Sequence, residues 1–160
     1  MSKAKRRDEL FKNCEKNIGR FVNHFHLIIT SVHGKNTKNE DFIALKDKFE
    51  VLKNANPSFI IEKAGPYIWK YKEQISGNNV AFFLNSNFED DIKEAQNENS
   101  IAEVSPYENI VMLMNQLKRT WHSFIPEEQN TIIKHTRAML KYYAGYLQDR
   151  KMMKNEGFDY

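Results

Sequence analysis

The chain has 160 residues, of which 41% are hydrophobic and 28% charged, and its formal net charge is +3. This length is typical of a single domain, and the hydrophobic content excludes an intrinsically disordered protein. With six glycines and four prolines, the chain has too few turn-forming residues for a many-stranded β-fold. We therefore expect a single-domain, all-α bundle of about five helices.

Cysteine usage and hydropathy bear on the compartment. Cys14 is the only cysteine, so no disulfide can form within the chain. The first thirty residues lack the apolar core of a secretory signal peptide, and no stretch approaches the roughly 20 apolar residues of a membrane span. These features predict an intracellular protein in a reducing compartment, without a membrane partner.

The first helix is predicted over residues 8–32, after a basic, disordered leader at 1–7. Apolar side chains recur three and four residues apart, which places them on one face of a helix. They are Phe11, Cys14, Ile18, Phe21, Phe25, Ile28 and Val32, and the stripe is widened by Val22 and Ile29. Gly19 lies within this helix, where its small size is expected to let another helix approach closely.

Two capped helices are predicted next. Asn39 is the expected N-cap of a helix over 40–53, which buries Phe42, Leu45, Phe49 and Leu52. Asn56 caps a third helix, with Pro57 at its first position. That helix continues to Ser76, with a kink or break expected at Gly65-Pro66 because proline removes a backbone hydrogen bond.

The run Val80-Ala81-Phe82-Phe83-Leu84 is short for a helix and is predicted to be an extended segment or a lone strand. Residues 88–96 are expected to form a short acidic helix, and residues 97–105 a mobile loop.

Two further helices complete the predicted bundle. Ser105, Pro106 and Glu108 form a capping box that starts a helix extending to about residue 123. Its apolar positions are Ile110, Met114, Leu117 and Trp121. The last helix starts at Pro126, and its apolar positions are Ile132, Ile133, Thr136, Met139, Leu140, Tyr143, Tyr146 and Leu147. The domain is expected to end at residue 151, followed by a disordered tail over 152–160.

No group of residues indicates catalysis or a bound metal or cofactor. The five histidines include no pair spaced i, i+4, which would place two imidazoles on one helix face. Cys14 lies on the apolar stripe, where a thiol behaves as a small, inert hydrophobic group. The acidic residues near 90 lack the loop pattern of a calcium site, and no glycine-rich phosphate-binding loop is present. The sequence therefore predicts a protein that is not an enzyme, with no cofactor, and the alternative is an enzyme whose site is assembled from scattered residues.

Charge is unevenly distributed along the chain. Seven acids and one base lie between Phe88 and Glu108, whereas eight bases and three acids lie between Lys118 and Lys154. Ordinary solvated faces are the simpler explanation of such segments. The alternative is nucleic-acid binding, in which bases neutralise phosphates and an outward-facing Tyr142 contributes a ring. The candidate residues are Lys3, Lys5, Arg6, Arg7, Lys118, Arg119, Lys134, Arg137 and Lys141.

Three stretches in the C-terminal part of the chain follow a recognisable order. They are a helix from Pro66-Tyr67 to Ile75, the segment Val80–Leu84 with Phe88 beyond it, and Leu117 to Trp121 before Glu127-Glu128 and the closing helix. In this order the chain resembles uncharacterised α-helical proteins encoded by large double-stranded DNA viruses of protists and algae. The resemblance implies a virus-encoded product, made in the host cytoplasm or packaged in the virion.

Two functions follow as expectations. The first is a non-enzymatic interaction protein, a viral structural or virus-factory component that contacts a partner protein or another copy of itself. The second is a nucleic-acid-binding or transcription-associated factor that uses the basic C-terminal helix. The basic leader is similar to a nuclear-localisation patch, so the nucleus is a further expected location.

Overall fold

The computed structural model describes residues 2–87 and 101–158, except the side chains of residues 101–108. All regular structure in these ranges is helical. The elements are α1 (Lys3–Gly34), α2 (Glu40–Ala55), α3 (Pro57–Lys70), α4 (Lys72–Ser76), α5 (Val80–Asn85), α7 (Ile101–Thr120), a 3₁₀ turn (Trp121–Ser123) and α8 (Pro126–Asn155). Five of the α-helices are of substantial length, so the prediction of an all-α bundle of about five helices is confirmed.

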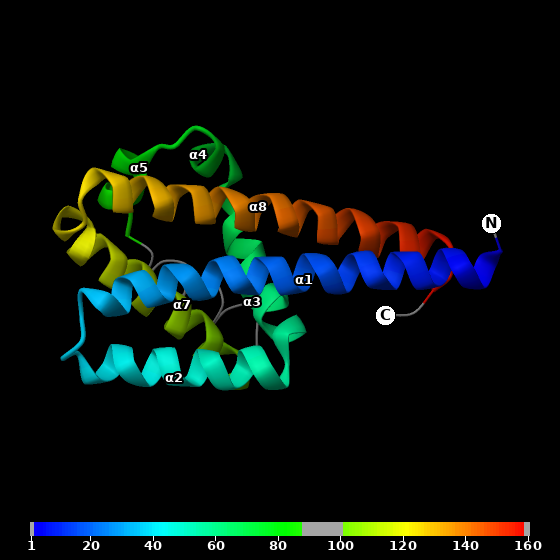
Figure 1. The fold of residues 1–160 in the computed structure, drawn as a ribbon, viewed down its shortest axis with the longest axis horizontal. Coiled ribbons are helices and arrows are strands. Elements are labelled where there is room, and N and C mark those ends of the chain that lie inside the picture. The colour runs from blue at the N-terminus through cyan, green and yellow to red at the C-terminus, as the bar shows by residue number, and fades with distance from the viewer. Residues whose placement is uncertain (1, 88–100, 159–160) are drawn as a thin grey trace.

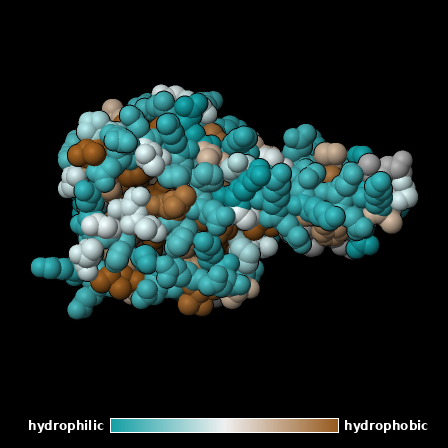
Figure 2. Space-filling model, in the orientation of Figure 1, coloured by the Kyte–Doolittle hydropathy of each residue, from teal (hydrophilic) through white to brown (hydrophobic). Residues whose placement is uncertain are grey.

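Helix α1 is the centre of the bundle. It contacts α2, α3, α7 and α8. Figure 1 shows α8 alongside α1 in the antiparallel direction, α2 on the other side of α1, and α3 crossing behind it. The two long helices continue past the rest of the bundle as a two-helix arm, which Figure 2 shows as a narrow extension of the wider body.

The predicted apolar stripe of α1 is confirmed. Its buried residues are Leu10, Cys14, Ile18, Phe21, Val22, Phe25, Ile28, Ile29 and Val32. The side chains of Cys14, Phe21 and Val32 have no exposed area, whereas Phe11 is half-buried and Leu10 takes the buried position beside it. Burying a side chain as large as leucine or phenylalanine contributes about 1.5–3 kcal/mol, so this stripe is a major source of stability.

The prediction of disordered ends is wrong for residues 3–7 and 152–158. Helix α1 begins at Lys3, and α8 continues to Asn155. Met153 is buried, and its Sδ atom accepts a hydrogen bond of 3.6 Å from the Cys14 thiol. Contacts between residues 139 positions apart leave no local sequence signal, which is why the ends were predicted to be disordered.

The predicted caps of α2 and α3 are confirmed. The side-chain oxygen of Asn39 accepts a hydrogen bond of 3.1 Å from the Phe42 amide, and Asn56 caps Phe59 in the same way at 3.4 Å. The expected break at Gly65-Pro66 is absent, because α3 continues through Pro66 and is interrupted only at Tyr71. Pro66 is exposed, so water can replace the backbone hydrogen bond that proline removes.

The prediction that the Phe-Phe-Leu segment is extended is wrong, because residues 80–85 form helix α5. The Asn79 side chain accepts a hydrogen bond of 3.0 Å from the Phe82 amide, and this cap stabilises a helix too short to form alone. The next long helix, α7, begins at Ile101 rather than at Ser105, so residues 101–105 are not a loop. The predicted acidic helix over 88–96 lies outside the described residues.

Close helix approach occurs at Gly65 and not, as predicted, at Gly19. A Cβ atom on Gly65 would overlap the ring of Tyr143, so this glycine allows α3 to pack directly against α8. No atom lies within 4 Å of the position that a Cβ atom would take on Gly19. A larger side chain is therefore excluded at Gly65 and has open space at Gly19.

We expect the substitutions Gly65→Ala and Gly19→Ala to change stability in opposite directions. Gly65→Ala forces the Tyr143 ring to move and is expected to destabilise the protein by about 1–3 kcal/mol. Gly19→Ala is expected to stabilise it by about 0.5–1 kcal/mol, because alanine is the better helix former in open space. Urea unfolding followed by circular dichroism measures both, and equal effects would contradict the packing at Gly65.

Candidate functional site

An apolar pocket is the most distinct candidate site in the described part of the chain. It has a volume of about 180 Å³ and lies between α1, α3, α4, α5, α7 and α8. Its walls include Phe25, Ile68, Phe82, Leu117 and Met139. An engineered cavity of about 150 Å³ holds a benzene molecule, so this pocket has room for one large apolar group.

The pocket wall formed by α4 and α5 is loosely packed. Neither helix has a buried residue, and Val80, Phe82, Phe83 and Leu84 are all half-buried. The Phe82 ring contacts the Tyr71 ring at a centroid distance of 5.9 Å. Apolar side chains are thus presented to the pocket by the least buried helices of the bundle.

The polar groups of the pocket suit binding rather than proton transfer. No charged side chain is among the described residues that line it. Asn79 is used to cap α5, and the Thr136 hydroxyl donates a hydrogen bond of 2.9 Å to the Ile132 carbonyl of its own helix. The arrangement can therefore take up an apolar group. No sequence motif pointed to this pocket, because its walls come from six separate helices.

The nine predicted nucleic-acid-binding residues fall into three groups. Lys3, Lys5, Arg6 and Arg7 lie at the tip of the arm, and Lys118 and Arg119 lie at the opposite end of the molecule, at the end of α7. The third group, Lys134, Arg137 and Lys141, lies between them on the exposed side of α8. Helix α1 is about 48 Å long at 1.5 Å per residue, so the first two groups are far apart.

Several of these bases have partners within the chain. Arg6 forms an ion pair with Glu156, and Lys118 donates a hydrogen bond to the Ser86 carbonyl. The ammonium group of Lys3 lies 5.8 Å from the ring centroid of Phe158. The guanidinium group of Arg7 lies 5.2 Å from the ring centroid of Phe11. Tyr142, predicted to face outward, is half-buried. Its ring stacks on the His24 ring, and the two ring centroids are 5.7 Å apart.

Two histidines from different helices meet beside Tyr142. The Nδ1 atoms of His24 on α1 and His135 on α8 lie 2.9 Å apart, so one ring donates the hydrogen bond and the other accepts it. Burial lowers the pKa of His24, and burial followed by the charge of His24 lowers the pKa of His135. The residues are 111 positions apart, so spacing along one helix could not reveal the pair.

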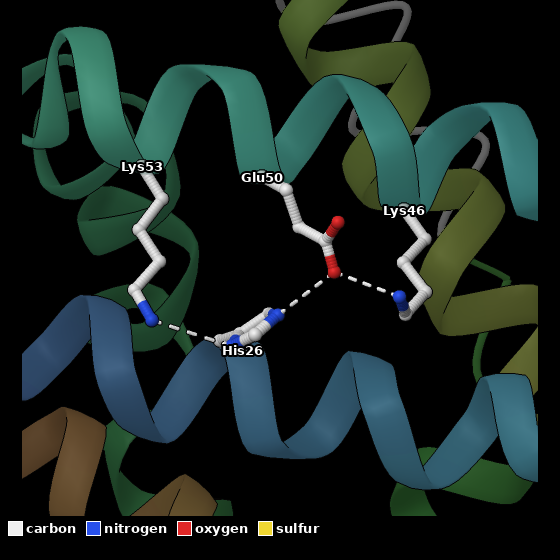
Figure 3. Close-up of polar contacts among 4 residues, drawn as sticks. All are labelled: His26, Lys46, Glu50 and Lys53. Atoms are coloured by element: carbon white, nitrogen blue, oxygen red, sulfur yellow. Dashed lines mark hydrogen bonds and ion pairs between the residues drawn. The ribbon is translucent and has the colours of Figure 1, made fainter.

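A second polar cluster joins α1 to α2, as Figure 3 shows. Glu50 Oε1 accepts a hydrogen bond of 2.7 Å from Lys46 and lies 3.3 Å from His26 Nε2. His26 Nδ1 lies 3.3 Å from the Lys53 ammonium. Lysine only donates, so Nδ1 accepts and the ring proton sits on Nε2, facing Glu50. The hydrogen bond from Lys46 and then that from His26 lower the pKa of Glu50. Because His26 lies on α1 and its partners Glu50 and Lys53 lie on α2, the cluster is a contact between the two helices.

The remaining candidates for chemistry are structural. Burial raises the pKa of the Cys14 thiol to about 11, so little of the reactive thiolate is present at neutral pH. Within the described ranges, no three side chains of histidine, cysteine, aspartate or glutamate are grouped to hold a metal ion. None of the described helices is long and apolar enough to cross a membrane.

The histidine pair is expected to make stability depend on pH. The pKa of each ring is lower in the folded than in the unfolded state, so below about pH 6.5 the unfolded chain binds more protons. Stability should therefore fall as the pH decreases from about 7.5 to 5.5.

Urea unfolding at these two pH values measures the effect, with the variant His135→Gln as the test. The substitution should reduce the loss of stability at low pH, whereas His122→Gln, at an exposed position, should behave as wild type. An unchanged pH dependence in His135→Gln would show that other groups cause it.

No protein-family model matches this chain, and neither a curated protein nor a solved structure does.

Proposed function

We propose that this protein is a non-enzymatic interaction protein that binds another protein through the apolar pocket beside α5. The observation that carries the proposal is the pocket itself, a space of about 180 Å³ with apolar walls and no charged lining residue in the described chain. Affinity between proteins is often concentrated in a few aromatic or aliphatic side chains that fill such pockets.

The position of α5 supports a macromolecular partner. Phe82, Phe83 and Leu84 are half-exposed on a short helix with no buried residue, so a partner's surface can cover them while one of its side chains enters the pocket. A partner that buries both would gain about 25 cal/mol for each Å² of apolar surface removed from water. The occupant we propose is a large apolar side chain, leucine or aromatic, presented by a partner protein.

The setting we propose is that of a viral structural or virus-factory component. It is supported by the order of the helical stretches from Pro66 to Glu128, which resembles that of helical proteins of large DNA viruses. The partner in that setting is a second protein of the particle or the factory, or another copy of this chain.

Substitution at the pocket opening tests the proposal. Phe82→Asp places a charge at the pocket and is expected to weaken partner binding by about tenfold or more, the effect of losing a central apolar contact. Val51→Asp is the control, because Val51 is 66% exposed on α2 and does not line the pocket. Quantitative affinity purification measures binding to a second protein. Light scattering after size-exclusion chromatography measures self-association.

Loss of the same partner, or of the same self-association, from both variants would argue against the pocket as the binding surface. A strictly monomeric wild type without a captured protein would argue against the interaction function itself.

A further inference from the structure

A basic strip follows the exposed junction of α1 and α8. Three polar contacts, two between the helices and one from Lys35 at the C-cap of α1, mark the junction, which we call the seam. They are Lys35 with Glu128 at 3.6 Å, His24 with His135 at 2.9 Å, and Asn17 with Asp149 at 3.0 Å. Between Glu128 and Asp149 the seam has no acid from either helix, because the sequence has no aspartate or glutamate at 16–39 or at 129–148.

Five exposed bases lie on this acid-free stretch. They are Lys16 and Arg20 on α1, and Lys134, Arg137 and Lys141 on α8. The Arg20 guanidinium lies 5.4 Å and the Lys141 ammonium 5.5 Å from the centroid of the Tyr142 ring, so the two helices bring their charges together there. The other three follow at spacings of three and four residues, which keep them on the exposed side.

The charges in the seam repel one another. Lys16 and Arg20 are four residues apart, as are Arg137 and Lys141, and like charges at this spacing destabilise a helix by a few tenths of a kcal/mol. The acids of α2 cannot neutralise them, because α2 packs on the side of α1 that carries His26. A bound polyanion would remove this repulsion.

We propose that the seam binds the phosphate backbone of a nucleic acid. The α8 bases Lys134 to Lys141 span about 10 Å at 1.5 Å per residue. Lys16, next to the Asn17–Asp149 contact, extends the strip to about 20 Å, a length that faces about six phosphates of one DNA strand at 3.4 Å each. The Tyr142 ring is stacked on His24 and lies beneath two cations, so it is not free to stack on bases. The contact is therefore independent of base sequence.

An anionic membrane is a poorer match to the same charges. A membrane-surface helix inserts a row of apolar side chains into the lipid. Among the described residues of α1 and α8, Leu27 is the one exposed large hydrophobic side chain. The seam has the charge of a membrane-binding surface without the apolar row.

The seam is separate from the pocket. Successive residues of a helix are rotated by about 100°, so the pocket residues Thr136 and Met139 lie nearly opposite Lys134 and Lys141. Arg137 follows the pocket residue Ile133 by four positions and lies at the edge between the two surfaces. Of the nine bases predicted from sequence, the proposal keeps the three on α8, and it adds Lys16 and Arg20. It does not use the arm, where Arg6 is paired with Glu156.

Fluorescence anisotropy with labelled oligonucleotides of mixed sequence, single- and double-stranded, tests the proposal across a salt series. For the wild type we expect binding at low salt and a slope of log K against log salt of about −4 with duplex DNA. The double variant Arg20→Glu/Lys141→Glu should bind at least about tenfold more weakly, with a slope smaller in magnitude by about 2.

The matched control is Lys5→Glu/Arg7→Glu, which changes the net charge equally at the exposed tip of the arm. It should retain binding within about threefold of wild type. Circular dichroism checks the fold of each variant, and Arg20→Gln/Lys141→Gln replaces the first variant if that one unfolds.

No binding at low salt, or equal losses in the seam and arm variants, would overturn the proposal. Tighter binding to vesicles that contain phosphatidylserine than to either oligonucleotide, lost in the seam variant, would assign the seam to a membrane instead. A strong preference for one base sequence would contradict the backbone contact.

Discussion

The apolar stripe of α1 constrains the rest of the structure. Its buried positions extend from Leu10 to Val32, along a helix of 32 residues. Among the described helices, α8 with its 30 residues is the one long enough to cover that stripe, because α2, α3 and α7 are much shorter. Where these three end, α8 continues beside α1 alone, and the paired ends of the chain become the arm.

Apolar contacts contribute more to this pairing than the charged contacts along it. The rings of Phe21 and Tyr143 lie 6.2 Å apart, and Gly65 makes room for Tyr143 on its other side. Burial of each such ring contributes about 1.5–3 kcal/mol, whereas an exposed ion pair such as Lys35–Glu128 contributes up to about 1 kcal/mol. The polar groups on the seam are thus not needed to hold the helices together, and their charges remain available to a ligand.

The features that the sequence predicted correctly are those set by neighbours in the chain. The stripe of α1 and the caps Asn39 and Asn56 depend on residues within a few positions, and they are confirmed. The errors arise where the local structure depends on a contact with a distant residue, or where a short apolar segment fits both a strand and a helix. Met153 orders the arm through Cys14, and the five apolar residues of α5 fit a strand or a helix until the Asn79 cap is known.

The candidate sites were less accessible to prediction for the same reason. The pocket walls come from six helices, and the histidine pair joins residues 111 positions apart. The absence of acids at 16–39 and 129–148 was visible in the sequence, but it acquires meaning only when α1 and α8 are known to lie side by side. Arg20 was therefore missing from the predicted bases, although it lies closer to Lys141 in the fold than any residue of the leader does.

The two proposed surfaces differ in the physics of binding. Removing apolar area from water in the pocket gives a negative heat-capacity change and an affinity that salt hardly weakens. Phosphate binding at the seam releases counterions and weakens steeply as salt rises. Because the pocket residues Thr136 and Met139 point nearly opposite to Lys134 and Lys141, a side chain that enters the pocket does not itself cover these two bases. The geometry thus allows one chain to hold a protein partner and a polyanion together, with salt releasing only the second.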